Sequence, residues 1–111
     1  MPDPCVFCQI IAGQRAATIV YRDDQVTAFR DLHPKAPTHI LVVPNRHLVS
    51  VSEAQAGDKD LLGTLLLTAA QVAKQEGVTG YRLIINNGAE AGQTVWHLHV
   101  HLLGGRRLTQ L

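Results

Sequence analysis

Hydrophobic and β-branched residues gather in five short segments that have the length and spacing of β-strands. Turn-forming residues separate these segments, and the first two segments are close enough in the chain to form a hairpin. We therefore predict strands at residues 18–21, 26–31, 38–44, 81–85 and 97–103.

Two other segments carry hydrophobic residues at helical spacing. A long helix is predicted over residues 58–75, where leucine, alanine and valine recur every three or four positions before Gly77. A short helix is predicted over residues 5–12, with Asp3 as its N-cap and Pro4 in its first turn. Between strand and long helix, the Ser50-x-x-Glu53 pattern is typical of a capping box, and we expect a short helical turn there.

This order of elements predicts the fold class. Short connections between the strands favour an antiparallel sheet, and the long helix is expected to cover one of its faces. We therefore expect an α+β fold in which a five-stranded antiparallel sheet packs with one long and one short helix. A chain of 111 residues is long enough for one hydrophobic core, so residues 1–111 are interpreted as a single domain.

The last predicted strand contains three histidines at alternate positions, His97, His99 and His101. Because side chains alternate between the two faces of a strand, these imidazoles are expected to share one face. Trp96, Leu98 and every second residue after them are expected to pack against the core on the other face. Three histidines in register indicate a functional site more than a packing arrangement.

Composition and charge exclude several classes of partner. The formal net charge is +1 and the sequence contains no block of basic residues, so nothing indicates binding to a long nucleic acid. No apolar run has the length of a membrane span, and the N-terminus lacks the pattern of a signal peptide. We expect a cytoplasmic protein that does not associate with a membrane.

From the residues alone, the histidines have two interpretations. They could hold a divalent metal, or a neutral imidazole could act as a nucleophile toward phosphorus. The preceding segment, residues 88–94, is rich in glycine and ends in a hydroxyl, and its backbone amides suit an anion. Cys5 and Cys8 are spaced C-x-x-C, which is compatible with a redox pair, half of a metal site, or two small apolar side chains.

The His97–Leu103 segment and its surroundings resemble the histidine-triad (HIT) family, whose signature is H-x-H-x-H followed by apolar residues. The resemblance covers nearly the whole chain. It includes residues 5–13, Phe29-Arg30-Asp31-Leu32, Pro37-Thr38-His39, and the Gly92-Gln93-Thr94-Val95-Trp96 segment directly before the histidines. Within the family, the chain is similar to the Hint branch of nucleotide-binding phosphoramidases.

The resemblance implies a hydrolase of purine nucleoside 5′-phosphoramidates that requires no cofactor for catalysis. His99 would attack the α-phosphorus and form a nucleotidyl-histidine intermediate, while His39 and His97 would support and orient it. Groups near the phosphate would donate hydrogen bonds to its oxygens, and the expected donors are His101, Thr94, Gln93, Asn86 and adjacent backbone amides. Thr94 stands where this branch commonly has Ser, and Trp96 where it commonly has Tyr.

The nucleoside site is also implied by the resemblance. Asp31 would bind the ribose hydroxyls, because a carboxylate offers two acceptors to a diol. The base would lie in an apolar slot formed by Phe7, Ile10, Phe29 and Leu32. Taken without the family, these four residues are typical core residues, and Asp31 is typical of a turn.

Two further expectations follow from the resemblance. Cys5, Cys8, His47 and His97 match positions that bind a structural zinc in some bacterial members, and a Cys₂His₂ set suits tetrahedral zinc. A homodimer is also expected, with residues 81–85 and the long helix at its interface. The C-terminal tail lacks the Trp-Pro segment of eukaryotic members, which bears on the preferred leaving group.

Other functions remain open at this point. The dinucleoside polyphosphate hydrolases of the family share the triad and its nucleophile. The nucleotidyltransferase branch usually has Gln at the third triad position, where this chain has His101. A nucleotide-binding adaptor protein is the alternative outside the enzymes.

Overall fold

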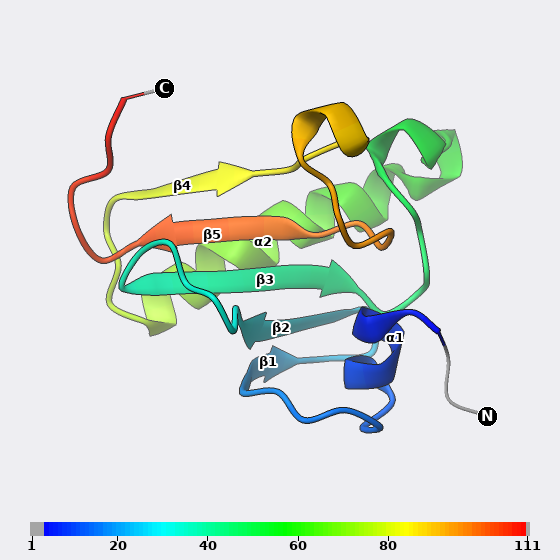
Figure 1. Cartoon of the computed structure of the whole chain (residues 1–111), viewed down its shortest axis with the longest axis horizontal. Helices are drawn as coiled ribbons and strands as arrows, with labels where there is room; N and C mark the ends of the chain where they lie inside the picture. Colours follow the sequence, from blue (N-terminus) through cyan, green and yellow to red (C-terminus); the bar gives the residue numbers. More distant parts are fainter. Residues whose placement is uncertain (1–3, 111) are drawn as a thin grey trace.

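Five strands form one sheet in the order β1-β2-β3-β5-β4 (Figure 1). Our computed structural model describes residues 4–110, and every pair of neighbouring strands in it is antiparallel. The strands are β1 (Ile19–Arg22), β2 (Val26–Arg30), β3 (Thr38–Pro44), β4 (Tyr81–Ile84) and β5 (Val100–Gly104). The predicted α+β fold is confirmed, and each of the first four predicted strands agrees to within one residue at either end.

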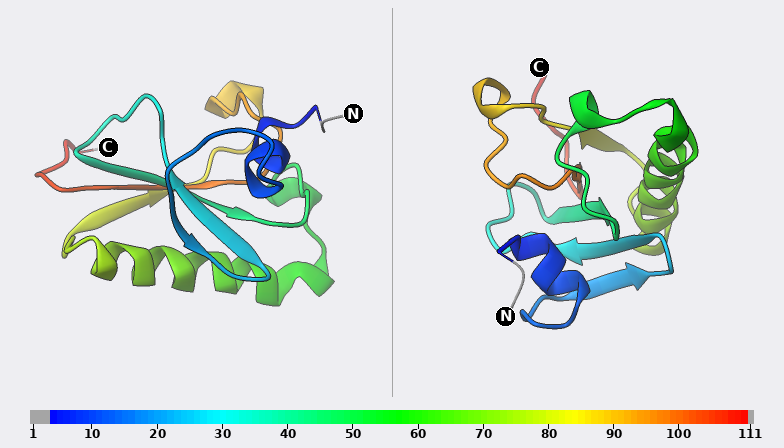
Figure 2. Two further views of the ribbon diagram at one scale, coloured as in Figure 1. Left: turned by 90° about the horizontal axis from the view of Figure 1, so that it is seen from below. Right: turned by 90° about the vertical axis from the view of Figure 1, so that its right-hand side faces the viewer.

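Helix α2 (Lys59–Gln75) covers one face of the sheet, as predicted (Figure 2). Its buried side chains pack against alternate residues of β2, β3 and β5, and this cluster is the larger core. The helix ends in a Schellman motif: Gly77 has a φ of +72°, and the Val78 N–H donates to the Ala73 carbonyl at 2.9 Å. The core residues are Val26, Ala28, Ile40, Val42, Leu48, Leu65, Ala69, Val72, Ala73, Leu98, Val100 and Leu102.

Helix α1 (Val6–Ile11) lies on the opposite face (Figure 2). It buries Phe7 and Ile10 against Phe29, Leu41 and Val43, which form a second, smaller core.

The start of α1 differs from the prediction. Cys5 is the N-cap, with an extended backbone and a thiol that accepts a hydrogen bond from the Cys8 N–H at 3.4 Å. Pro4 therefore precedes the cap instead of lying in the first turn. The predicted cap, Asp3, lies outside the described residues.

Three short 3₁₀ helices complete the architecture: η1 (Val51–Glu53), η2 (Ala56–Asp58) and η3 (Ala89–Ala91). The predicted capping box at Ser50 is wrong, because the Ser50 hydroxyl pairs with the Ser52 hydroxyl at 3.1 Å and makes no cap hydrogen bond. A capping box forms instead between Gln55 and Asp58, directly before α2.

The histidine segment enters the sheet later than predicted. Strand β5 begins at Val100, and before it the Leu98 N–H donates to the Leu48 carbonyl at 2.6 Å, outside the sheet ladder. Alternation nevertheless continues back to Leu98, which is buried in the larger core. It stops there, so the prediction for Trp96 is wrong: its side chain is 48% exposed.

None of the helices within residues 4–110 is long and apolar enough to cross a membrane.

Candidate active site

Two adjacent strands bring His39 and His101 together on the sheet face opposite α2. The register of β3 and β5 pairs Leu41 with His101 and His39 with Leu103. His39 and His101 are therefore diagonal neighbours in an antiparallel pair, and such side chains touch when they are long or aromatic. Their rings meet, with 3.0 Å between His39 Nε2 and His101 Nδ1.

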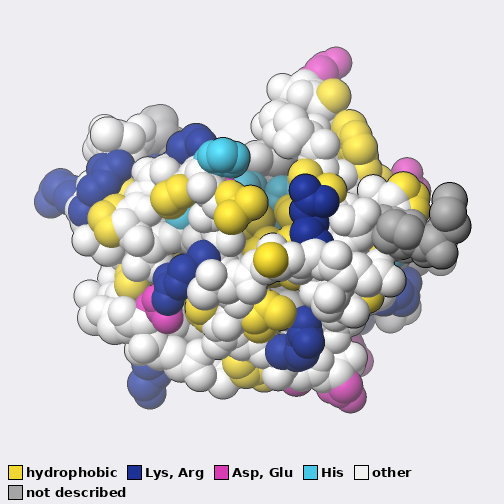
Figure 3. Space-filling model, turned by 60° about the horizontal axis from the view of Figure 1, so that its bottom comes forward, with side chains coloured by type: hydrophobic (Ala, Val, Ile, Leu, Met, Phe, Trp, Pro, Cys, Tyr) yellow, Lys and Arg dark blue, Asp and Glu magenta, His cyan; other side chains and the backbone are white. Residues whose placement is uncertain are grey.

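A pocket of about 300 Å³ opens beside these histidines. Figure 3 shows histidine side chains in and beside a hollow of the surface, with hydrophobic and basic side chains around it. The second core forms one wall, so three of the four residues predicted for a base slot, Phe7, Ile10 and Phe29, are at once core residues and pocket lining, whereas Leu32 is exposed. Residues that line the pocket include Phe7, Ile10, Phe29, Asp31, Leu32, Leu41, Thr94, His99 and His101.

His99 presents a lone pair at Nε2. Its Nδ1 lies 2.7 Å from the His97 carbonyl, which only accepts hydrogen bonds, so Nδ1 carries the proton of the neutral ring. Burial lowers the pKa of His99 below its ordinary value, and the Phe7 ring packs edge-on against the imidazole with 5.1 Å between centroids. At pH 7 the ring is therefore neutral, held in place, and has the tautomer that a nucleophile requires.

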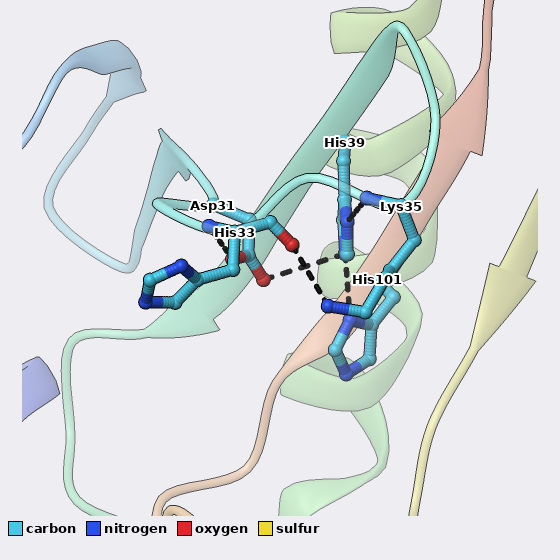
Figure 4. Close-up of polar contacts among 5 residues, drawn as sticks. All are labelled: Asp31, His33, Lys35, His39 and His101. Carbon is cyan, nitrogen blue, oxygen red and sulfur yellow. Dashed lines mark hydrogen bonds and ion pairs between the residues drawn. The ribbon is translucent and has the colours of Figure 1, made fainter.

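His39 and His101 form a chain with a defined tautomer at each step (Figure 4). The Lys35 backbone N–H donates to His39 Nδ1 at 3.0 Å, so neutral His39 carries its proton on Nε2. That N–H donates to His101 Nδ1, which places the His101 proton on Nε2. Burial, followed by the neighbouring His99 and His39, lowers the pKa of His101 to about 4, so at pH 7 His101 is a neutral hydrogen-bond donor.

Asp31 lies beside this chain. Its Oδ1 accepts the His33 backbone N–H at 2.8 Å, and its Oδ2 lies 3.4 Å from His39 Nε2. Asp31, His39 and His101 offer metal-type ligand atoms within 4.8 Å of one another. The tautomers argue against a metal at this point, because a proton occupies the His39 Nε2 position that a metal would need.

The loop before the histidines contributes to the pocket through Thr94, and its other groups are engaged internally. The Gln93 side chain accepts the Gly88 N–H at 2.9 Å and donates to the Val49 and Val95 carbonyls at 2.7 and 3.1 Å.

The predicted phosphate donors in this loop are therefore only partly supported. The backbone amides of Ala91, Gly92 and Gln93 donate within the loop, so these three amides are not free for an anion. Asn86 is half-buried, and neither it nor Gln93 is among the residues that line the pocket. Thr94 is exposed and lines the pocket, as predicted.

A second cluster, separate from the pocket, contains Cys5, Cys8, His47 and His97, whose ligand atoms all lie within 4.8 Å. The Cys5 thiol lies 3.4 Å from His97 Nδ1, and the Cys8 thiol lies 3.4 and 3.5 Å from Nδ1 of His47 and His97. Sulfur and nitrogen ligands of a tetrahedral zinc are about 3.5 Å apart, given zinc bonds of about 2.3 and 2.0 Å.

The tautomer of His97 also suits a metal. Its Nε2 lies 2.8 Å from the Pro44 carbonyl, so Nε2 carries the proton and the Nδ1 lone pair faces the two thiols. Zinc-binding histidines in proteins usually donate their other N–H to a backbone carbonyl or carboxylate in this way. These four residues fit a structural zinc, and His97 belongs to this cluster instead of the pocket.

Several residues that line the pocket were not predicted for the site, among them His33 and Leu41. His33 is exposed on the loop between β2 and β3, where it lines the pocket and its N–H donates to Asp31 Oδ1. An aspartate that accepts the N–H two residues ahead is an Asx turn, and Asp31-x-His33-Pro34 carries that signal. Leu41 shares the face of His39 because the two are two positions apart on β3, which the strand period predicts.

Comparison with known proteins places the chain in a family. A family model described as the HIT domain matches residues 12–108. The purine nucleoside phosphoramidase of Escherichia coli K12 is 47% identical over 110 residues, which cover 97% of this chain and 92% of that protein. The 14 kDa zinc-binding protein of Zea mays is 47% identical over 108 residues, which cover 95% and 84% of the two chains.

Solved structures agree as well. A histidine triad protein from Clostridium difficile superposes with a TM-score of 0.94 at 41% identity, and the match covers 100% of this chain and 99% of that one. The match to the HIT model spans most of the sequence and includes all three histidines of the H-x-H-x-H motif. The chain therefore belongs to the HIT family.

Proposed function

We propose that this protein hydrolyses the P–N bond of purine nucleoside 5′-phosphoramidates and releases a nucleoside monophosphate and an amine. Its family, together with the hydrolase and phosphoramidase names of its relatives, makes it a nucleotide hydrolase of the histidine-triad type. One observation carries the finer proposal: His99 holds an Nε2 lone pair at a pocket that also contains the neutral donor His101.

The reaction is proposed in two steps. His99 Nε2 attacks the α-phosphorus, and the P–N electron pair leaves with the amine, which takes up a proton through the Thr94 hydroxyl and water. Water then attacks the nucleotidyl-histidine, breaks the bond between phosphorus and His99, and releases the nucleoside monophosphate. In both steps the His101 Nε2–H donates to a non-bridging oxygen, so the reaction requires no cofactor.

The nucleoside is proposed to lie against the second core. Phe7, Ile10 and Phe29 line the pocket from its buried wall, while Leu32, which is 79% exposed, forms its rim. A purine in this pocket would pack one face against the apolar wall and contact Leu32 at the rim. Asp31 lies between this slot and the histidines, where it is proposed to accept hydrogen bonds from the ribose hydroxyls.

The remaining predicted residues have supporting roles in this proposal. His97 orients His99 through its carbonyl, whereas His39, which was expected to orient His99, is hydrogen-bonded to His101 and orients that ring instead. Gln93 holds the loop that presents Thr94, because its amide is bonded to three backbone groups of the protein. Asn86 stays a predicted phosphate donor.

Comparing two substrates tests the proposal. Adenosine 5′-phosphoramidate with a fluorescent amine presents a P–N bond, and diadenosine polyphosphate presents a P–O–P bond at the same nucleoside. We expect kcat/KM to be at least about a hundredfold higher for the phosphoramidate, which corresponds to about 2.7 kcal/mol in the transition state. Fluorophore release and nucleotide chromatography measure the two rates.

The reverse preference would assign the chain to the dinucleoside polyphosphate hydrolases. Binding of adenosine monophosphate without turnover of either substrate would favour the nucleotide-binding adaptor.

We also propose that one structural zinc binds per chain at Cys5, Cys8, His47 and His97. Three sulfur-to-nitrogen distances of 3.4–3.5 Å, close to those between ligands of a tetrahedral zinc, support the proposal. A zinc there would join the start of α1 to the segment that carries the nucleophile. Its role would be structural, because His97 Nε2 is bonded to Pro44 and the cluster lies outside the pocket.

A homodimer is the third proposal. β4 is an edge strand of the sheet, and edge strands readily pair with another chain. Large apolar side chains are exposed along β4 and α2: Tyr81 is 39%, Leu66 46% and Leu67 75% exposed. Large exposed apolar side chains on an edge strand and on the helix of the same domain are typical of an interface.

Substitution of Leu67 by aspartate is expected to shift the protein from dimer to monomer at micromolar concentration. A twofold interface contains the substitution twice, and each copy loses about 1.5–3 kcal/mol of apolar burial and buries a charge. Sedimentation velocity measures the change. Leu32→Asp is the matched control, because Leu32 is equally exposed but lies at the pocket rim; a wild-type monomer would contradict the proposal.

A further inference from the structure

We propose that Asp31 is also a positioning residue for the phosphate-facing histidine. Its carboxylate acts together with the Lys35 N–H to select the tautomer of His39, and through His39 it gives His101 an N–H donor at Nε2. The inference rests on the proposed function, because the donor is aimed at the phosphate of a bound nucleotide. It goes further than ribose binding, because the same carboxylate would bind the ribose hydroxyls and would also position the histidine that binds the phosphate.

The carboxylate is held so that its two oxygens have different neighbours (Figure 4). Oδ1 accepts the His33 N–H at 2.8 Å, and this Asx turn fixes the rotamer. Oδ2 is thereby directed at His39 Nε2, 3.4 Å away. The geometry leaves the negative charge of the carboxylate next to one nitrogen of His39 and not the other.

Two neighbours therefore select the same tautomer of His39. The Lys35 N–H points at Nδ1 at 3.0 Å and requires a lone pair there. The Asp31 carboxylate lies near Nε2 and favours a proton there. Since His39 Nε2 also faces His101 Nδ1 at 3.0 Å, the proton on His39 leaves His101 with its own proton on Nε2.

The opposite arrangement would work against the reaction. If His39 Nε2 lost its proton, His101 Nδ1 would have to supply one, and a neutral His101 would then turn a lone pair at Nε2 toward the pocket. A lone pair next to anionic phosphate oxygens repels them, whereas an N–H stabilises them. The tautomer chain thus decides whether His101 assists or opposes catalysis.

Asp31→Asn probes this chain directly. Because the His33 N–H needs an acceptor, the amide oxygen takes the Oδ1 place and the NH₂ group faces the His39 Nε2–H, donor against donor. We expect kcat to fall about 10- to 100-fold, as when an oriented donor to a reacting oxygen is removed or weakened. Asp24→Asn is the control, since it removes the same charge from an exposed turn, and it is expected to leave kcat unchanged.

A substrate without ribose hydroxyls separates the two roles of Asp31. With 2′,3′-dideoxyadenosine 5′-phosphoramidate, a residue that only binds ribose has nothing left to bind, so Asp31→Asn would change neither kcat nor KM. We expect kcat for this substrate to fall by about the same factor as for the ribonucleoside. An unchanged kcat with the dideoxy substrate would overturn the inference while leaving the proposed hydrolysis intact.

The tautomers themselves provide a readout that does not need turnover. Long-range ¹H–¹⁵N spectra of protein labelled in histidine distinguish Nδ1–H from Nε2–H rings. In the wild type we expect the Nε2–H form of both His39 and His101, and in Asp31→Asn a substantial population of the other form. Unchanged tautomers in the variant would overturn the inference whatever the kinetics, and a wild type that hydrolyses neither phosphoramidate would overturn the proposed function separately.

Discussion

Replacing His99 by alanine is expected to lower turnover of an adenosine 5′-phosphoramidate with a fluorescent amine by at least about a thousandfold. The substitution removes the Nε2 lone pair that is proposed to attack phosphorus. Neighbouring imidazoles cannot replace it, because His101 Nδ1 accepts from His39 and His97 faces the cysteine cluster. Fluorophore release by wild type and variant, measured side by side, checks the prediction.

Binding and folding controls make the result interpretable. Phe7 loses its edge-on contact with the imidazole, but Phe7, Ile10 and Phe29 remain packed in the second core, so the variant is expected to bind adenosine monophosphate with an affinity within about tenfold of wild type. Equal, slow rates in both proteins would show that His99 is not the nucleophile. A variant that neither binds nor keeps the wild-type circular dichroism would be compared instead with His99→Gln, which retains bulk in the site.

Loss of zinc is expected to have the largest effect on stability. Protein purified without chelator is predicted to contain about one zinc per chain, and Cys8→Ser to contain well below one. A ligand present at about a thousand times its Kd stabilises the folded state by about 4 kcal/mol. For a domain of this size, that corresponds to a fall in Tm of about 15 °C or more.

Chelation supplies the matched comparison. A strong chelator should lower the Tm of wild type to near that of Cys8→Ser, and it should leave the Tm of Cys8→Ser unchanged. Elemental analysis and thermal denaturation together measure both effects. Well under one zinc per chain in wild type, or a wild-type Tm that the chelator does not change, would contradict the proposed site. Either result would favour the alternative that the two cysteines are small apolar packing residues.

Much of the fold is encoded locally. The continuous apolar run of β3, which is buried on both faces, and the leucine and alanine spacing of α2 specify those elements, and the structure has them at the predicted positions. Gly77 ends α2 because a positive φ is easily adopted by glycine. Local predictions are wrong where a side chain bonds to a different partner, as for Ser50, whose hydroxyl pairs with Ser52 and does not cap a helix.

The histidine segment shows how far a local pattern extends. The alternation of apolar residues holds from Leu98 onward because those side chains pack under α2. It fails at Trp96, because the backbone there no longer follows the sheet ladder and Leu98 already bonds to the Leu48 carbonyl. Spacing along the chain therefore identified the face of the histidines but not the point where the strand begins.

Fold class, most element boundaries, the family and the residue types available for chemistry can all be read from the amino-acid sequence. The family resemblance already implied that His97 lies with the two cysteines, but the hydrogen bonds of His99 to the His97 carbonyl and of His101 to His39 are known only from the tertiary structure. The tautomers follow from these partners. The hydrogen bonds by which Gln93 holds its loop, and the contact between Asp31 and His39, are likewise visible only in the tertiary structure. The reason is physical, because periodicity is a property of neighbouring residues, whereas the proton on an imidazole is set by donors and acceptors that arrive from other strands and loops.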